Sequence, residues 1–408
     1  MGIDQVASNR RFESDHSGVS RKPMPSDFRI ALGVFRDDAF LMGEAVLKEV
    51  CVVQTVLADY RVRFHENVMQ LLPGVSYRVL CGEDCFDPAT RTAESGRALV
   101  VPVRNRYGWG RRFLWQQGAW GKTRRAEIVV LNFNLRILSN YPVLWWRYLR
   151  GRPTLLWGHT EGRGSASRRW RFLQTYFCDG FIAYTEEQRR RLASAHPRLR
   201  VFAAPNACLG NEDCLVTESE DGSQPGNILY VGRLVPAKKP DLLLRAFASG
   251  VENGMLAEET RLEMVGSGPM ESTLRELADS LGILDRIIWH GHVGDVDRLR
   301  ECYGRALVAV SPGYVGLSAM QAFGFGVPMI VAREEPHSPE VAVCETGFNT
   351  RWVASDDPRE LASALQEFFR DRDHWISRRP LISAKLRDSH TFEIMAGRYV
   401  EAIRAVMD

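Results

Sequence analysis

Residues 227–250 read NILYVGRLVPAKKPDLLLRAFASG. They place an apolar strand pattern, a short polar turn and an amphipathic helical pattern in direct succession. A short strand followed at once by a helix is the repeating unit of a parallel sheet that is covered by helices. This stretch therefore predicts an α/β fold, and the question is how far the same unit repeats.

The alternation continues in both directions along the chain. Downstream, strand patterns recur in RLEMVGSG, RIIWHGHV, LVAVSP and PMIVA, with helical patterns between them. Upstream, apolar strand patterns occupy 50–57, 77–82, 98–103, 127–133, 153–159, 180–185 and 201–207. We therefore predict the α/β class, with two Rossmann-like, doubly wound domains that face each other across a cleft.

The domain boundary is marked by composition. Residues 210–226, GNEDCLVTESEDGSQPG, are acidic, polar and without periodicity. A chain of 408 residues also fits two domains better than one core. The predicted parts are a mobile N-terminal arm (1–29), an N-terminal Rossmann-like domain (30–209), a hinge linker (210–226), a C-terminal Rossmann-like domain (227–388) and a C-terminal helix (389–408) that packs back on the N-terminal domain.

Charge and tryptophan are distributed unevenly. The formal net charge is +3, yet residues 101–200 carry 20 Lys and Arg against 5 Asp and Glu, together with seven of the ten Trp. Arg and Trp mixed in this way suit an anionic membrane surface or an anionic acceptor, with contact through 104–125 and 145–172. A solvated basic face with Trp in the core explains the same composition. Both interpretations stay open.

Cysteine usage and hydropathy bound the location. The eight cysteines are scattered, and no Cys/His cluster has the spacing of a zinc site. We therefore expect no metal and reduced thiols, which are typical of the cytoplasm. No apolar run approaches the roughly 18–20 residues of a membrane span, so any membrane contact would be peripheral, at the inner face. The basic stretch carries no nucleic-acid motif, and no nucleic-acid partner is expected.

Two cations follow the strand of the opening stretch. Arg233 comes directly after the strand, and Lys238 lies five residues further on, just before the helix. A Gly-rich turn, PGYVGLSAMQAF (312–323), follows a later strand, and Gly316 lets the backbone approach an anion there. Cations and the N–H groups of a helix start both bind phosphate. Since parallel strands end at one edge of the sheet, the two turns together predict a diphosphate site.

Four motifs in a fixed order carry a family resemblance. Strand–GR–x4–K–helix, VGSGP (265–269), WHGHV (289–293) and the GL…A…G.P turn and helix resemble the C-terminal domain of retaining glycosyltransferases of family 4, which have the GT-B fold. The resemblance spans roughly 226–350, whereas in the first half only the architecture and APN (204–206) match. It implies a nucleoside-diphosphate sugar as co-substrate in the C-terminal domain, an acceptor in the N-terminal domain, and no metal or other cofactor.

The resemblance also implies roles for single residues. Arg233 and Lys238 would hold the diphosphate, and His159 in LLWGHTEGR would lie near the donor sugar, which makes these three the candidate catalytic residues. A His that only caps the strand is the other interpretation of His159. The candidate donor-binding residues are Gly232, Gly266, Gly268, Val293, Gly313, Gly316, Leu317, Gln321 and Glu340.

This sequence departs from the family in one respect. The family usually has two Glu eight positions apart at the Gly-rich turn, and here Gly313 and Gln321 stand in those places. Gln retains an acceptor oxygen, so ribose binding could survive at the second position, while the first position loses its carboxylate. A replacement could come from Glu334, Glu335, His337 or Glu340 in the loop REEPHSPE, although an exposed polar loop is the alternative.

The acceptor side rests on position alone. Tyr60 and Arg61 follow the first strand, where an acceptor should approach, and they are the candidate acceptor-binding residues. The implied function is retaining transfer of a sugar to a lipid-linked or glycan acceptor in polysaccharide or glycolipid synthesis. Two alternatives remain, namely a glycosyltransferase that acts on a soluble small molecule and a non-catalytic partner subunit that binds a nucleotide sugar.

Overall fold

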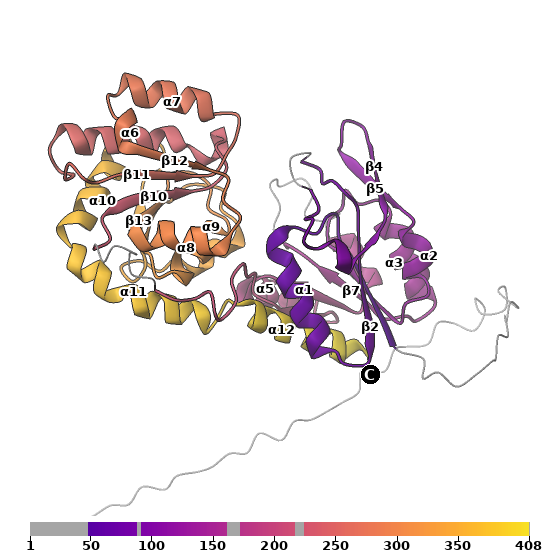
Figure 1. Ribbon diagram of the computed structural model, residues 1–408. Coiled ribbons are helices and arrows are strands. Elements are labelled where there is room, and N and C mark those ends of the chain that lie inside the picture. Colours follow the sequence, from indigo (N-terminus) through magenta and orange to yellow (C-terminus); the bar gives the residue numbers. More distant parts are fainter. Residues whose placement is uncertain (1–47, 88–90, 161–171, 217–223, 408) are drawn as a thin grey trace, which may run out of the picture. The chain divides into compact units, whose positions relative to one another are not determined.

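The structure, a computed structural model, describes residues 48–87, 91–160, 172–216 and 224–407 (Figure 1). The predicted arm, residues 1–29, lies outside these ranges. The described residues form two parallel sheets, each with its own helices, and a small antiparallel hairpin. No helix among them is long and apolar enough to cross a membrane.

The first domain is built on a seven-stranded parallel sheet. Across the sheet the strands are β3 (Val100–Pro102), β2 (Val75–Cys81), β1 (Lys48–Val53), β6 (Ile128–Asn132), β7 (Thr154–Trp157), β8 (Gly180–Ala183) and β9 (Arg200–Ala203). The helices are α1 (Asp59–Leu71), α2 (Ala119–Thr123), α3 (Asn140–Leu149), α5 (Glu186–Ala195) and α12 (Phe392–Met407). Val50 and Val52 pack in a cluster with α1 and α12, whereas Cys51 and Val53 pack with α2, α3 and α5 on the other face. Burial on both faces explains the continuous apolar runs in the sequence.

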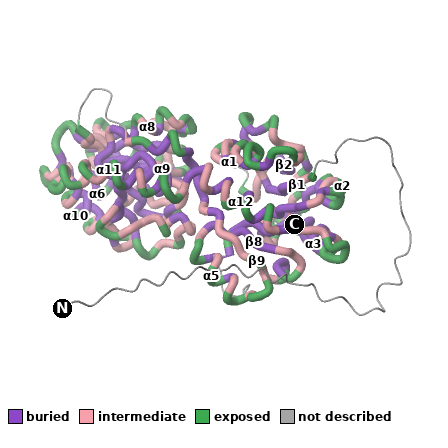
Figure 2. The backbone as a smooth tube through the Cα atoms, turned by 90° about the horizontal axis from the view of Figure 1, so that it is seen from below, coloured by how far each residue is buried: buried purple, intermediate pink, exposed green. Residues whose placement is uncertain are grey.

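The second domain is built on a six-stranded parallel sheet. Across it the strands are β12 (Ile287–Gly291), β11 (Leu262–Val265), β10 (Asn227–Val231), β13 (Ala306–Ser311), β14 (Met329–Ala332) and β15 (Thr350–Val353). The helices are α6 (Pro240–Glu252), α7 (Glu271–Ser280), α8 (Val296–Arg305), α9 (Ser318–Gly324), α10 (Pro358–Arg370) and α11 (Arg372–Arg387). Ile228 and Tyr230 face the cluster with α6, α7 and α10, while Leu229 faces the cluster with α8, α9 and α11. Figure 2 shows buried residues running through the inside of each domain.

Local side-chain caps set several helix starts. Thr185 stands before α5, and its side chain accepts a hydrogen bond from the N–H of Gln188. Asp295 and Asp357 cap α8 and α10 in the same way. Side-chain oxygens at this position satisfy N–H groups that the first helical turn leaves without partners.

Several elements, α2 and α3 among them, were missing from the sequence interpretation. The sixth strand, β15, has the short sequence TRWV without an apolar run. Helix α11 carries Pro380 in its interior and has little amphipathic character, which hid it from a search for 3.6-residue spacing. The hairpin of β4 (Arg104–Gly108) and β5 (Phe113–Gln117) lies in the Arg- and Trp-rich stretch that was interpreted only by composition.

The last helix belongs to the core of the first domain. Phe392, Tyr399 and Ile403 of α12 lie in the same apolar cluster as Val50 and Trp157. Phe64 of α1 meets the Tyr399 ring edge-on at a centroid distance of 5.2 Å. The C-terminal segment therefore stabilises the domain that begins the described chain.

Candidate functional site

Three loops meet at the carboxyl ends of β10, β11 and β13. Gly266, with a positive φ of 140°, leaves no room for a side chain, because a Cβ there would lie 1.8 Å from the carbonyl oxygen of Gly232. A Cβ on Gly268 would lie 2.3 Å from the carbonyl oxygen of Leu234, and one on Gly313 would lie 2.7 Å from that of Ala237. These glycines therefore let the neighbouring turns close around the loop 232–238. They shape the predicted donor site through backbone packing.

Lys238 lies at the centre of this loop cluster. It ends the short 3-10 helix Pro236–Lys238, and its Nζ donates a hydrogen bond of 2.6 Å to the carbonyl oxygen of Tyr314. The Nζ also lies 4.2 Å from the centroid of the Tyr314 ring. Lys238 forms no ion pair with any carboxylate of the described residues. Burial and then the neighbouring Arg233 lower the pKa of Lys238 to about 8.

Arg233 is the more exposed of the two cations. Its guanidinium Nη1 lies 2.7 Å from Oδ2 of Asp87, and 64% of the Arg233 side chain is exposed. An ion pair that exposed contributes little to stability and can exchange for another anion. The backbone of Arg233 is held by the hydroxyl of Tyr230, which donates to its carbonyl oxygen at 3.0 Å. Two cations therefore stand at one sheet edge, where their mutual repulsion favours an anionic ligand.

The turn after β13 presents open backbone to the same region. A Cβ on Gly316 would meet nothing closer than 3.7 Å. Within the described residues no acceptor is found for the N–H groups of Gly316 and Leu317. The turn is fixed by His337, whose Nδ1 accepts from the N–H of Val315 at 3.1 Å and whose Nε2 donates to the carbonyl oxygen of Ala332 at 2.9 Å. Burial lowers the pKa of His337, in keeping with a neutral ring in this bridging role.

The loop after β14 does not supply a free carboxylate at Glu334 or Glu335. Glu334 accepts a hydrogen bond of 2.9 Å from the N–H of Ser355, and Glu335 lies 2.6 Å from Nζ of Lys239. The suggestion that these two replace the missing family Glu is therefore not supported. Gln321 is half-buried on α9, and its side chain makes no hydrogen bond with another described residue.

Glu340 is buried and differs from its neighbours in the loop. It lies in the 3-10 helix Pro339–Val343, and one carboxylate oxygen accepts a hydrogen bond from Nδ2 of Asn206. Oε2 of Glu340 and Oδ1 of Asn206 have no hydrogen-bond partner in the described part of the chain. A buried carboxylate with an unused oxygen is costly unless a donor reaches it. Asn206, which the sequence analysis noted only in APN, is thus the residue that positions Glu340.

The predicted acceptor residues lie in different environments. Tyr60 is half-buried, whereas Arg61 is only 6% exposed and packs among aromatic rings, with its guanidinium 4.9 Å from the Trp157 ring centroid. Arg61 donates to the Tyr184 hydroxyl at 3.3 Å and to the Met395 sulfur. We therefore correct the interpretation of Arg61 as an open acceptor-binding side chain, because its donors point into the core.

His159 is exposed at the end of β7, and its ring lies 4.5 Å from that of Tyr184. Tyr184 thus joins His159 and Arg61, a link that no sequence pattern predicted.

Val293 is buried in the apolar cluster beside α8, so its side chain serves packing rather than polar recognition. The structure brings Arg233, Lys238 and the Gly316 turn together, as predicted.

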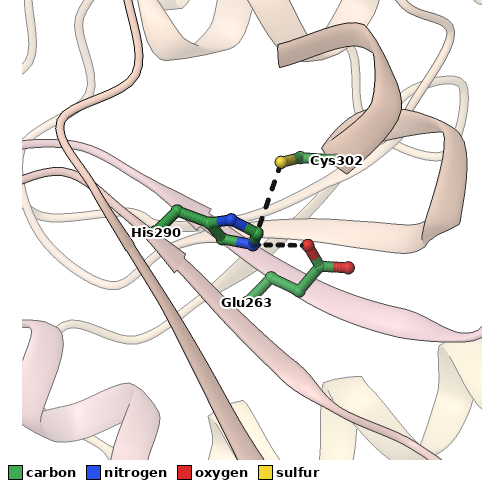
Figure 3. Close-up of side chains that lie close together, drawn as sticks. All are labelled: Glu263, His290 and Cys302. Carbon is green, nitrogen blue, oxygen red and sulfur yellow. Dashed lines mark hydrogen bonds and ion pairs between the residues drawn. The ribbon is translucent and has the colours of Figure 1, made fainter. Parts of the chain in front are cut away.

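A second polar cluster in the second domain is formed by residues of β11, β12 and α8 (Figure 3). Nε2 of His290 on β12 lies 2.7 Å from Oε2 of Glu263 on β11 and 3.9 Å from the sulfur of Cys302 on α8. Glu263 is fully buried, and it also accepts hydrogen bonds from Nε and Nη2 of Arg305 at 2.9 and 2.8 Å and from Asn227 at 2.8 Å.

The chemistry of this cluster is that of a charge network. Burial opposes ionisation of Glu263, but hydrogen bonds from His290, Arg305 and Asn227 outweigh it and lower the pKa to about 2. The contacts with Cys302 and Glu263 raise the pKa of His290 to about 9, and the carboxylate is the closer partner. A metal ion here would have to displace Arg305, so the residues fit a structural clamp between α8 and the sheet rather than a metal centre.

Comparisons with known proteins show what parts of this chain resemble. Residues 218–385 match the family described as "Glycosyl transferases group 1". "D-inositol 3-phosphate glycosyltransferase 2" of Catenulispora acidiphila is 36% identical over 147 residues, which cover 34% of this chain and 34% of that protein. "D-inositol 3-phosphate glycosyltransferase" of Streptomyces avermitilis is 29% identical over 226 residues, which cover 51% and 44%. The chain thus spans between about a third and a half of the length of these curated relatives.

A solved structure resembles nearly the whole chain. That of Anabaena Alr3699/HepE in complex with UDP covers 88% of this chain and 100% of its own, with a TM-score of 0.66 and 13% sequence identity. Likeness at this identity concerns the fold, and it confirms the predicted GT-B fold with two Rossmann-like domains.

Proposed function

We propose that the protein is a retaining, metal-independent glycosyltransferase that moves a sugar from a nucleoside-diphosphate sugar to a lipid-linked or glycan acceptor. The observation that carries the proposal is the pair of Arg233 and Lys238 at the end of β10. Lys238 is desolvated, lacks a carboxylate partner among the described residues and has a pKa lowered to about 8. A diphosphate between the two cations would favour the ammonium form and raise this pKa again, and the family match of residues 218–385 supports a nucleotide sugar as its source.

The proposed chemistry needs few side chains. The bond between the anomeric carbon and the diphosphate oxygen breaks, and the nucleoside diphosphate leaves with added negative charge. Two fixed cations and the open N–H groups of Gly316 and Leu317 stabilise that charge in the place where other enzymes use a metal. We propose attack on the same face of the sugar, with a leaving phosphate oxygen accepting the proton of the acceptor hydroxyl. Because the leaving phosphate acts as the base on this path, the reaction does not need a carboxylate at position 313.

The second position of the family pair has a role in donor binding. We place the Gln321 side chain at the ribose, where its carbonyl oxygen accepts a hydroxyl proton. Its half-buried position and its lack of a side-chain partner among the described residues support this. His159 and Glu340 remain proposals as the residues nearest the sugar, since one is an exposed strand-end His and the other keeps an unused carboxylate oxygen.

The acceptor is the open part of the proposal. We favour a lipid-linked or glycan acceptor, used in polysaccharide or glycolipid synthesis at the cytoplasmic side, where the eight free cysteines stay reduced. A second candidate is a soluble small molecule, favoured by relatives named as D-inositol 3-phosphate glycosyltransferases. A non-catalytic nucleotide-sugar-binding subunit is the third, motivated by the missing Glu pair.

Donor binding is tested first. Thermal unfolding with a panel of nucleoside diphosphates and their sugars should show stabilisation by one base, about 2.7 kcal/mol at 100 times the dissociation constant. Gly316→Val should abolish that shift without lowering the stability of the free protein, because a Cβ there would make only ordinary van der Waals contacts, at 3.7 Å or more. Stabilisation by no nucleotide, or an unchanged shift in Gly316→Val, would contradict the donor site.

Turnover separates the enzyme from the binding subunit. The donor sugar nucleotide whose base binds should be tested for hydrolysis and for transfer to lipid-linked, glycan and soluble small-molecule acceptors. Each reaction should be measured with and without EDTA. Activity that persists in EDTA supports the metal-free mechanism. Activity that is lost in EDTA and restored by Mg²⁺ would contradict it, and tight binding without any turnover would favour the non-catalytic subunit.

A further inference from the structure

The hairpin of β4 and β5 has two chemically different faces. Asn105, Leu114 and Gln116 point toward the domain: Leu114 is fully buried, and the two amides donate to the carbonyl oxygens of Thr55 and Gln54. The residues between them are exposed. Arg106 is paired with Trp115 across the strands, and Arg104 with Gln117. The outer face of the hairpin therefore exposes Arg and Trp side chains, while hydrogen bonds from its inner face fix it to the domain.

The tip of the hairpin holds its most exposed apolar side chain. Trp109 is 78% exposed, more than any other large apolar side chain of the described residues, and its ring lies 5.4 Å from that of Phe113. Its backbone has a positive φ of 47°, an unfavourable conformation for a residue other than glycine. Contacts of the neighbouring residues with the rest of the domain hold this turn. Arg111 bonds to Asp84 at 2.7 Å, and Arg136 donates to the carbonyl oxygens of Arg111 and Arg112 at 2.6 and 2.7 Å.

Two helices continue this exposed surface. The chain passes from β5 directly into α2, and the start of α3 is tied to β5, where the N–H of Gln116 donates to Ser139. Trp120 of α2 meets Trp146 of α3 edge-on at 6.0 Å. Trp145, Tyr148 and Leu149 of α3 are 60%, 49% and 49% exposed. Figure 1 shows α2 and α3 side by side on one flank of the first domain, with the hairpin above them.

The charge of this surface is of one sign. Residues 104–152 contain ten Arg and one Lys against a single acidic residue, Glu127. Several of these cations also bind within the domain: Arg147 is buried against carbonyl oxygens, and Arg111 pairs with Asp84. Arg136 and Arg152 donate to backbone carbonyl oxygens. All four Trp that are exposed in the described residues fall in this segment. Exposed indoles among cations are uncommon on a surface that faces only water.

We propose that this surface docks on a bilayer that contains anionic phospholipids. The surface, which we call the basic tryptophan face, consists of Arg104, Arg106, Trp109, Arg112, Trp115, Trp120, Arg124, Arg125, Trp145, Tyr148, Leu149 and Arg150.

Three observations select this partner. Trp and Tyr prefer the boundary between water and hydrocarbon, and Arg pairs with lipid phosphates. The exposed aliphatic side chains Leu138 and Leu149 have no use in stacking on nucleic-acid bases. Since no described helix can span a membrane, contact through these helices and this hairpin would be peripheral. The inference stands apart from the proposed transfer reaction, because it uses none of the donor-site residues.

The test is co-sedimentation of the full chain with vesicles. Vesicles of phosphatidylcholine alone are compared with vesicles that also contain phosphatidylglycerol. We expect binding only to the second kind, with a blue shift of Trp emission and a loss of binding as salt rises, because screening shortens the range of attraction to about 10 Å at 0.1 M. Arg106→Glu with Arg124→Glu should weaken binding at least about tenfold.

Matched variants separate this face from general effects. Trp109→Ser with Trp145→Ser should also weaken binding at least about tenfold and remove most of the blue shift. Leu71→Ser on α1 is the apolar control, and Arg245→Glu with Arg298→Glu in the second domain is the charge control; all three positions are exposed, and both controls should bind as the wild type. If the Trp variant fails to fold, judged by thermal unfolding, the Arg variant alone decides.

Four results would overturn the proposal. The first two are equal binding to both kinds of vesicle and no binding to either. The third is a loss of vesicle binding in the control variants as large as in the Arg and Trp variants. The fourth is binding of single-stranded RNA, but not of vesicles, that is abolished by the Arg and Trp substitutions. Donor binding measured without lipid reports on the transfer proposal separately, so failure of one leaves the other intact.

Discussion

Lys238 should make the binding of a nucleoside diphosphate depend on pH. Burial and the neighbouring Arg233 lower its pKa to about 8 from an ordinary value of 10.5. A diphosphate bound between the two cations favours the ammonium form and raises this pKa again. Below about pH 8 the ammonium is already present. At higher pH, binding has to take up a proton, so the affinity falls as the pH rises.

The size of the effect follows from the lowered value. At about pH 9, one unit above the pKa, only about one lysine in ten is charged in the free protein, so the affinity should be about tenfold lower than at neutral pH, or ~1.4 kcal/mol. The free protein changes in the opposite direction. Between about pH 8 and 10.5 its unfolded state binds more protons than its native state, so this lysine adds stability as the pH rises.

Isothermal titration calorimetry in two buffers of different ionisation enthalpy measures both the affinity and the protons taken up. Lys238→Arg is the matched control, because a guanidinium stays charged throughout this range. We expect proton uptake at about pH 9 in the wild type and none in Lys238→Arg, with UDP and GDP tried in turn. A flat affinity in the wild type, or the same pH dependence in both proteins, would refute the contact between Lys238 and the anion.

Three further outcomes are expected. Arg233→Ala should lower turnover by about 10²-fold, the scale of losing one preorganised donor to developing charge, and an unchanged rate in the folded variant would remove Arg233 from the clamp. Gln321→Ala should weaken donor binding by about 1–2 kcal/mol in calorimetry, while Gln321→Glu keeps it; the reverse order would place the side chain away from the ribose. His290, with a pKa raised to about 9, contributes stability that is complete below about pH 6.5 and is lost as the pH rises through about 9. In urea unfolding, the difference in free energy of unfolding between the wild type and His290→Gln should therefore become smaller as the pH rises through that window. A difference that does not change with pH would contradict the clamp.

Local patterns in the sequence were sufficient to predict most strands of the two parallel sheets. Strands such as β6 and β13 are buried along nearly their whole length, so they appear as apolar runs that need no tertiary information to detect. The caps at Thr185 and Asp295 are local in the same sense, because a cap acts within one helical turn. The pairing of Arg233 and Lys238 with the Gly316 turn also followed, since parallel strands end at one sheet edge.

Other elements have no local signal. The strand β15 is short and half polar, and it exists because β14 offers a free edge with which it pairs. The hairpin of β4 and β5 was hidden because its inward residues, Asn105 and Gln116, are polar and gain their hydrogen bonds only from distant backbone. A hydrophobic pattern cannot report a face that is buried through amides.

The sequence by itself determined most of the segments that become strands and helices, and where two cations follow a strand, because those properties depend on neighbours within a few residues. Tertiary structure alone decided which side chains are open to a ligand. Arg61 looked accessible after the first strand, yet Trp157, Tyr184 and Met395 cover it from three other elements. Glu263, His290 and Arg305 lie up to 42 residues apart and became one charge network only when β11, β12 and α8 packed. Burial and hydrogen bonding, which set these pKa values and exposures, are sums over contacts between segments that are distant in the chain.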